Sequence, residues 1–74
     1  MPIPKGYRQI ADDLRARIAA GEFRPGERLP TYRVLSEHYD VTVTTVQKAV
    51  LLLQGAGLVV GVQGVGLYVA EEKT

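Results

Sequence analysis

The chain contains no cysteine, and this absence removes several chemistries. No disulfide can stabilise the fold, and no thiolate can ligate a metal ion or act as a nucleophile. His38 is the single histidine, and no cysteine or paired carboxylate joins it, so the sequence indicates neither a metal centre nor a nucleophile–base pair. We therefore expect no catalytic site, no metal and no cofactor, and a reducing cytoplasm is the simplest compartment.

Long hydrophobic runs are also missing. The longest uninterrupted apolar stretch is Ala49–Leu53, which is far too short to cross a membrane. The segment Met1–Lys5 is proline-punctuated and too brief to contain the apolar part of a signal peptide. These observations predict a soluble protein without a membrane partner.

The chain has little excess charge of either sign, with a formal net charge of +1. Its distribution is uneven, because residues 1–48 carry eight Lys and Arg against six Asp and Glu, whereas residues 49–74 carry one against two. Any contact with a polyanion that depends on positive charge must therefore come from the first two thirds of the chain.

The 74 residues are enough for one small domain (1–74), and hydrophobic periodicity predicts three helices in it. They span about residues 6–20, 32–39 and 43–54. In the first, Ile10, Leu14 and Ile18 form one apolar stripe, and Gly21 ends the helix. In the third, Val46, Ala49, Val50 and Leu53 have helical spacing.

The segments between these helices contain turn and cap residues. Pro25-Gly26 marks a compact connector with a short strand, and Phe23 and Leu29 are expected to pack on the core. Thr31 and Thr42 are suitable N-caps for the second and third helices. Between these two helices, Asp40 suits a left-handed turn, beside a buried Val41. In the second helix, Val34 and Leu35 are expected to face inward.

Two β-rich runs, at about residues 58–62 and 67–70, flank Gln63-Gly64-Val65-Gly66 and predict an antiparallel hairpin. Three helices followed by a hairpin is the order of a winged helix. The predicted fold is therefore mainly α with a small β-hairpin, namely a winged helix-turn-helix made of a three-helix bundle and a two-stranded C-terminal wing.

Two short helices joined by a tight bend, the second beginning with small polar residues, are typical of a helix-turn-helix. Short side chains at this helix start let the backbone approach the major groove of DNA. The hydroxyls of Thr42, Thr44 and Thr45, with the free N–H groups of the first turn, suit a phosphate, and Lys48 is one turn further on. Spacing alone leaves two interpretations open, a DNA reader or a generic helical module.

Nearly the whole chain, from Tyr7 to Val69, resembles the GntR family of bacterial regulators. The resemblance begins with Tyr7, Ile10, Leu14, Ile18 and Gly21, and continues through Pro25-Gly26 and Arg28-Leu29-Pro30. The second-helix segment is Thr31-Tyr32-Arg33-Val34-Leu35-Ser36, where the family has Ser-Glu-Arg. The remaining matches are Val41–Val50, Leu53, Gly57-Leu58-Val59, Gln63-Gly64, Gly66 and Val69.

The resemblance implies a transcription regulator, a repressor, in the bacterial cytoplasm and nucleoid. Such a protein binds double-stranded DNA in a sequence-specific manner, as a homodimer on a pseudo-palindromic operator. The third helix would enter the major groove, and the hairpin would lie near the minor groove. It also implies a small-molecule effector that binds a C-terminal domain, which we expect to be absent from these 74 residues. Without dimer avidity, the chain alone is expected to bind weakly.

The chain departs from the family pattern where DNA contacts are expected. Val43 and Gln47 occupy positions that are usually arginine, and Val60, Gly61, Val62 and Val65 occupy wing positions that are usually basic. The DNA-contact candidates are Arg33, Thr42, Val43, Thr44, Thr45, Gln47, Lys48, Gln63 and Gly64. Weaker candidates for contact with the DNA backbone are Lys5, Arg8 and Tyr32.

Two explanations of the departures remain open. In one, Val43 packs on a thymine methyl group and Gln47 bonds an adenine edge. In the other, DNA binding has weakened and the domain serves protein interaction or dimerisation. Leu51 and Leu52 bear on this choice, because they are either covered by residues 6–20 or the hairpin, which we favour, or exposed as an interface.

Overall fold

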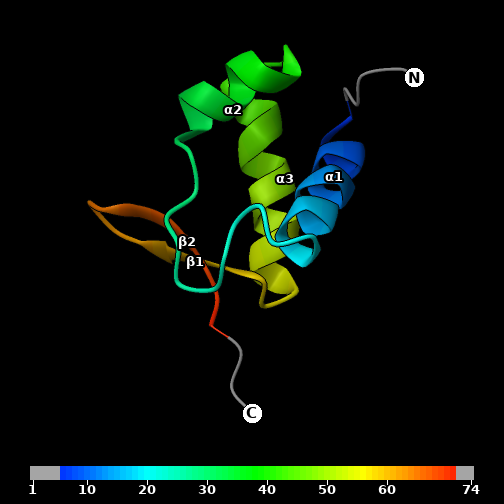
Figure 1. Cartoon of the computed structure of the whole chain (residues 1–74). Coiled ribbons are helices and arrows are strands. Elements are labelled where there is room, and N and C mark those ends of the chain that lie inside the picture. The colour runs from blue at the N-terminus through cyan, green and yellow to red at the C-terminus, as the bar shows by residue number, and fades with distance from the viewer. Residues whose placement is uncertain (1–5, 72–74) are drawn as a thin grey trace.

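The computed structural model describes residues 6–71, so Lys5 lies outside the described residues. Three helices, α1 (Tyr7–Ala19), α2 (Tyr32–Tyr39) and α3 (Val43–Gly55), precede two strands, β1 (Val59–Val62) and β2 (Gly66–Val69) (Figure 1). The expected architecture, mainly helical with a C-terminal hairpin, is confirmed, and each boundary lies within one residue of its expected position. No helix within the described residues is long and apolar enough to cross a membrane.

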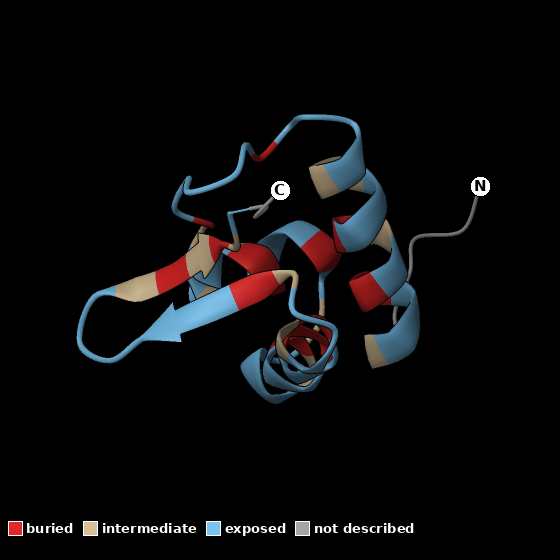
Figure 2. Ribbon diagram, turned by 90° about the horizontal axis from the view of Figure 1, so that it is seen from below, coloured by how far each residue is buried: buried red, intermediate tan, exposed pale blue. Residues whose placement is uncertain are grey.

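α3 is the central element of the fold, and α1, α2 and β1 pack against it. Its inward face consists of Val46, Ala49, Val50 and Leu53, none of which is exposed to solvent. α1 contributes Ile10, Ala11 and Leu14 to the same core and ends before Gly21, whose φ of 87° suits a residue without a side chain. Figure 2 looks nearly along α3 and shows its buried residues turned toward the other helices and its exposed residues turned outward.

Threonine caps position the two helices that follow the connector. The Thr31 hydroxyl accepts a hydrogen bond from the Val34 N–H, and the Thr42 hydroxyl accepts one from the Thr45 N–H, both at 3.2 Å. Asp40 adopts the expected left-handed conformation, with φ of 57° and ψ of 50°. Both caps follow from local chemistry, because a threonine oxygen replaces the helical partner that a first-turn N–H lacks.

The prediction that Val34 faces inward is wrong. Val34 is 50% exposed, whereas Leu35 and Tyr39, one turn apart on the same face of α2, are buried. The buried face of this short helix is therefore set by positions 35 and 39. The neighbouring Ser36 is also buried, and its hydroxyl donates a hydrogen bond to the Arg33 carbonyl oxygen at 2.7 Å.

The hairpin pairs Val59 with Val69 and Val62 with Gly66, and it turns at Gln63 and Gly64. Leu67 and Val69 of β2 point into the core, where they meet the buried Phe23 and Leu29 of the connector. The connector also runs along β2, with a single antiparallel bridge between Arg28 and Tyr68 in place of the expected short strand.

A polar cluster that was not anticipated from the sequence ties α1 to α2. The Tyr39 hydroxyl donates to the Asp13 carboxylate at 2.5 Å and accepts from the Arg17 guanidinium at 3.2 Å. Arg17 also bonds Glu22 at 3.3 Å and lies 4.9 Å from the centre of the Phe23 ring. Burial, followed by the hydrogen bond to Asp13, raises the pKa of Tyr39 to about 12.

Candidate nucleic-acid interface

A row of exposed side chains lies along the outer face of α3. It consists of Val43, Thr44, Gln47 and Lys48, and we call it the α3 row. Val43 is 39% exposed. Within residues 6–71, the side chains of Thr44, Gln47 and Lys48 have no hydrogen-bond or salt-bridge partner. The row therefore offers one apolar, two neutral polar and one cationic group to an external ligand.

Thr42 and Thr45 are placed differently from the α3 row. Their hydroxyl oxygens lie 2.9 Å apart, and the Thr42 oxygen also caps the Thr45 N–H. Thr45 is only half-exposed. Because both hydroxyls take part in the cap, Thr44 has the one uncommitted threonine hydroxyl at the beginning of α3.

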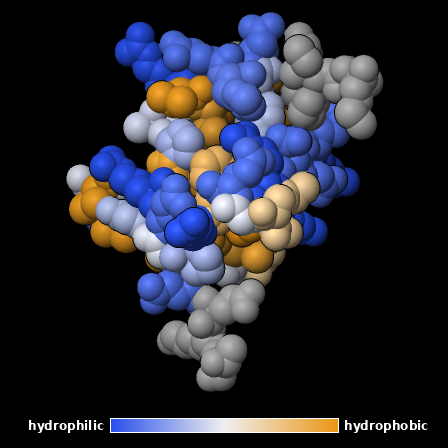
Figure 3. All heavy atoms as spheres, in the orientation of Figure 1, coloured by the Kyte–Doolittle hydropathy of each residue, from blue (hydrophilic) through white to orange (hydrophobic). Residues whose placement is uncertain are grey.

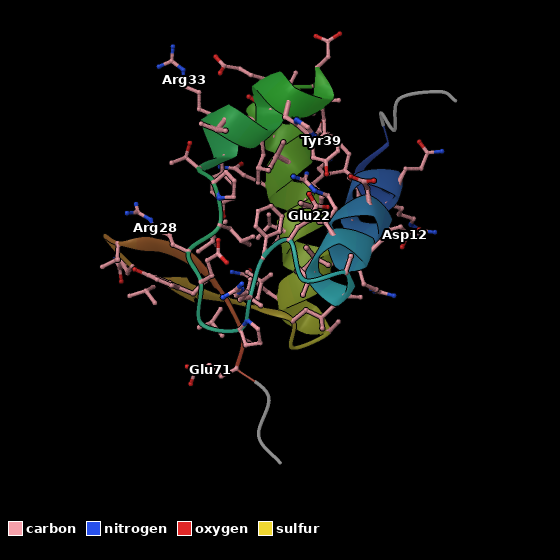
Figure 4. The ribbon with its side chains drawn as sticks, in the orientation of Figure 1. Asp12, Glu22, Arg28, Arg33, Tyr39 and Glu71 are labelled. Atoms are coloured by element: carbon pink, nitrogen blue, oxygen red, sulfur yellow. The ribbon has the colours of Figure 1, made fainter. Side chains whose placement is uncertain are left out.

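Arg33 projects from α2, and its side chain is 86% exposed. Its nearest carboxylate is that of Glu37, with 3.8 Å between Arg33 Nε and Glu37 Oε2. A loose pair between two exposed side chains contributes little, so the guanidinium is free to exchange this partner for a phosphate. Figure 4 shows Arg33 pointing away from the body of the protein.

The hairpin projects from the body on the same side as Arg33 (Figures 1 and 4). Gln63 and Gly64 are exposed at its turn, where Gly64 has φ of 79°. Val60, Val62 and Val65 are exposed, and residues 58–70 contain no lysine or arginine. Hydrophobic atoms accordingly occupy the projecting end of the hairpin (Figure 3).

An open hollow of about 460 Å³ lies between the hairpin and helices α2 and α3. Tyr32 at the beginning of α2 and Gln54 near the end of α3 line it, together with hairpin residues 61–67. The hollow brings Tyr32 together with Gln63 and Gly64. Arg8 is not part of this group, because it lies on α1, which is on the other side of α3 from the hairpin (Figure 1).

The expectation that α1 or the hairpin covers Leu51 and Leu52 is wrong for the described residues. Leu51 is 63% exposed and Leu52 is 41% exposed. α1 packs on the face of α3 that carries Val46, Ala49, Val50 and Leu53, and positions 51 and 52 are rotated away from it. The two leucines therefore form apolar surface beside the α3 row.

Sequence reasoning did not select Arg28 as a contact residue, although the structure places it next to the hairpin (Figure 4). In the sequence, Arg28-Leu29-Pro30 contributes only to the family resemblance. The pairing of this loop with β2 is what places Arg28 beside the hairpin. It joins residues 40 positions apart and leaves no local pattern in the sequence.

A family model described as "Bacterial regulatory proteins, gntR family" matches residues 6–69. The mannosyl-D-glycerate transport/metabolism system repressor MngR of Escherichia coli is 43% identical over 67 residues, or 90% of this chain and 28% of MngR. The Uxu operon transcriptional regulator of E. coli is 38% identical over 65 residues, or 88% of this chain and 25% of that protein. The chain thus spans about a quarter of the length of these curated relatives.

Solved structures of DNA-binding regulators are also similar to this chain. The DNA-binding domain of AraR in complex with operator ORR3 is 33% identical, with a TM-score of 0.83 over 86% of this chain and 77% of that one. YtrA from Sulfolobus acidocaldarius, a GntR-family transcription factor, is 40% identical, with a TM-score of 0.81 over 90% of this chain and 70% of YtrA.

Proposed function

Because the chain belongs to the GntR family of bacterial regulatory proteins, we propose that it binds double-stranded DNA in a sequence-specific manner as part of a transcription regulator. In this proposal the beginning of α3 enters the major groove and the hairpin lies near the minor groove. The observation that carries the proposal is the α3 row, whose polar side chains are exposed and without partners in residues 6–71. The similarity to AraR, which was solved with operator DNA, supports it.

Contacts with phosphates fix the position of such a domain on the duplex. We assign this role to the cations Arg33 and Lys48, to the Thr44 hydroxyl and to the N–H groups of the first turn of α3. Thr42 can join them by donating its hydroxyl proton to the phosphate while its oxygen accepts from Thr45. That turn is the positive end of the helix dipole, which favours a phosphate. Tyr32, half-exposed at the edge of the hollow, is a further candidate through its hydroxyl.

In this proposal, Val43, Thr45 and Gln47 contact the edges of the bases. Gln47 can bond both the N6 and N7 atoms of adenine, and Val43 can pack on the methyl group of thymine. Thr45 would contribute its methyl group, since its hydroxyl is bonded to that of Thr42. Gln63 and Gly64 would approach the minor groove, where a glycine lets the backbone come close.

For the whole protein we propose a homodimer that represses transcription from a pseudo-palindromic operator. MngR is named as a repressor, which supports this direction of regulation. A small-molecule effector would act through a C-terminal domain outside the described residues. Two linked half-sites would raise the affinity far above that of one domain.

The proposal is tested by titrating wild-type chain, Arg33→Ala and Gln47→Ala with duplexes selected from a random pool. Arg33→Ala should weaken binding to every sequence and lower the slope of log K against log salt by about 1. Gln47→Ala should cost about 1–3 kcal/mol on the selected duplex and relax the preference at one base position. If neither change alters affinity, α3 is not the contact surface.

A second candidate function is protein interaction or dimerisation with weakened DNA binding. The exposure of Leu51 and Leu52, together with the valines of the hairpin, favours it, because a small domain rarely leaves such apolar surface uncovered. This candidate differs from the first in requiring self-association or a protein partner without DNA.

A further inference from the structure

Arg28 is held beside the hairpin by its backbone. On one side of it, the Leu29 N–H donates to the Leu67 carbonyl oxygen at 2.8 Å, and on the other, the Val69 N–H donates to the Glu27 carbonyl oxygen at 2.9 Å. Arg28 itself pairs with Tyr68 in an antiparallel bridge. The connector therefore fixes the position of the Arg28 Cα atom relative to β2.

The Arg28 side chain lies against Gly66 of β2. A Cβ atom at position 66 would come within 2.9 Å of Arg28 Nε and 3.3 Å of Nη2, so a side chain at this position would displace the guanidinium. Gly66 also has a φ of 145°, which other residues rarely adopt. Arg28 is exposed, and within residues 6–71 no carboxylate lies within salt-bridge distance of it.

Arg28 lies beside a hairpin that has no positive charge of its own. Residues 58–70 carry no lysine or arginine and expose three valines, so the hairpin itself has no cation for a phosphate. Arg28 places a guanidinium next to it, and Figure 4 shows Arg28 and Arg33 projecting on the same side of the protein. Between the connector and the hairpin is a notch of about 190 Å³ that Arg28, Thr31, Tyr32 and Val65 help to line.

We propose that Arg28 binds a backbone phosphate of the DNA duplex and supplies the positive charge that the hairpin lacks. The inference rests on the proposed function and adds a contact to it, on the hairpin side of α2. An exposed guanidinium without a carboxylate partner loses no ion pair on binding, and its donors match a phosphate in geometry.

The test compares Arg28→Gln with Arg15→Gln, two changes that remove the same charge from exposed arginines, one in the connector and one on α1. Arg15 lies on α1, where it lines a hollow with Leu58 and Val69 at the base of the hairpin and not at its turn. The probe is a short labelled duplex that the wild-type chain selects from a random pool. Arg28→Gln should weaken binding about eightfold at about 0.1 M salt and lower the slope of log K against log salt by about 0.9. Arg15→Gln should leave both unchanged, and Arg28→Lys should keep the slope.

A second readout identifies the phosphate. Uncharged methylphosphonate is introduced at one duplex position at a time, and the position bound by Arg28 should weaken wild-type binding but have no further effect on Arg28→Gln. The position bound by Arg33 should still affect Arg28→Gln. Equal thermal midpoints of the wild-type chain and its Arg28→Gln, Arg15→Gln and Arg28→Lys variants would show that the fold is intact.

Failure of the proposed function and failure of the role of Arg28 give different results. If the wild-type chain selects no duplex, or if neither Arg33→Ala nor Gln47→Ala alters affinity, the proposed function fails and the inference fails with it. If Arg33→Ala weakens binding as expected while Arg28→Gln behaves like Arg15→Gln, only the role of Arg28 is overturned.

Discussion

At the scale of single residues, Tyr39 makes the stability of this domain sensitive to alkaline pH. Its pKa is raised to about 12 by burial and by the hydrogen bond to Asp13, whereas the unfolded chain has the ordinary value of about 10. A raised pKa means that the folded state retains the proton more strongly. The stabilisation is therefore complete below pH about 10 and is lost as the pH rises from about 10 to about 12.

Tyr39→Phe removes this effect together with the hydrogen bonds to Asp13 and Arg17. We expect the substitution to lower the free energy of unfolding by about 1–3 kcal/mol at neutral pH, because Asp13 loses a buried donor. Urea unfolding of both proteins from neutral pH to pH 12 checks this. The difference between them should shrink above pH 10, and a difference that stays constant would contradict the assignment.

How far residues could be predicted from the sequence depends on how local their interactions are. Thr31, Thr42 and Asp40 were predicted because a cap or a left-handed turn is decided within a few residues. The Tyr39 cluster and the position of Arg28 were missed, since Tyr39 meets Asp13 from 26 residues away and Arg28 meets a strand much later in the chain. The contact roles of the α3 row remain predictions.

At the scale of elements, the beginning of α3 depends on its cap. Residues 41–46 are rich in valine and threonine, which favour strands, yet the segment from Val43 is helical. We expect Thr42→Ala to lower the free energy of unfolding by about 1 kcal/mol, while Thr42→Ser, which keeps the capping oxygen, stays close to wild type. Chemical denaturation of the three proteins measures this, and equal stability of the Ala and Ser variants would show that the cap contributes nothing.

The elements themselves were predictable because their patterns are strong. The spacing of Val46, Ala49, Val50 and Leu53 gives the helix, and the glycines around residues 61–66 give the hairpin. What the pattern could not decide was the covering of Leu51 and Leu52, because both lie next to buried positions along the chain. Only the packing of α1 on one side of α3 leaves them exposed.

At the scale of the whole molecule, the exposed leucines separate the two candidate functions. For a DNA-binding domain we expect the chain to be a monomer at micromolar concentration in the absence of DNA and to shift a selected duplex. Sedimentation velocity with and without duplex measures both properties. A tight dimer that dissociates on substitution of Leu51 and Leu52 by Ser, combined with no duplex binding, would favour the protein-interaction function.

The connector that runs along β2 has a consequence for the DNA itself. Its backbone hydrogen bonds from Gly26, Leu29 and Val69 join the hairpin to the segment that leads directly into Thr31 and α2. In the proposed function, the distance between the helix that enters the major groove and the hairpin at the minor groove is thus fixed by the protein. A duplex whose groove spacing differs from this distance would have to bend or twist to bind, so base pairs that no side chain touches would be selected by how easily they deform.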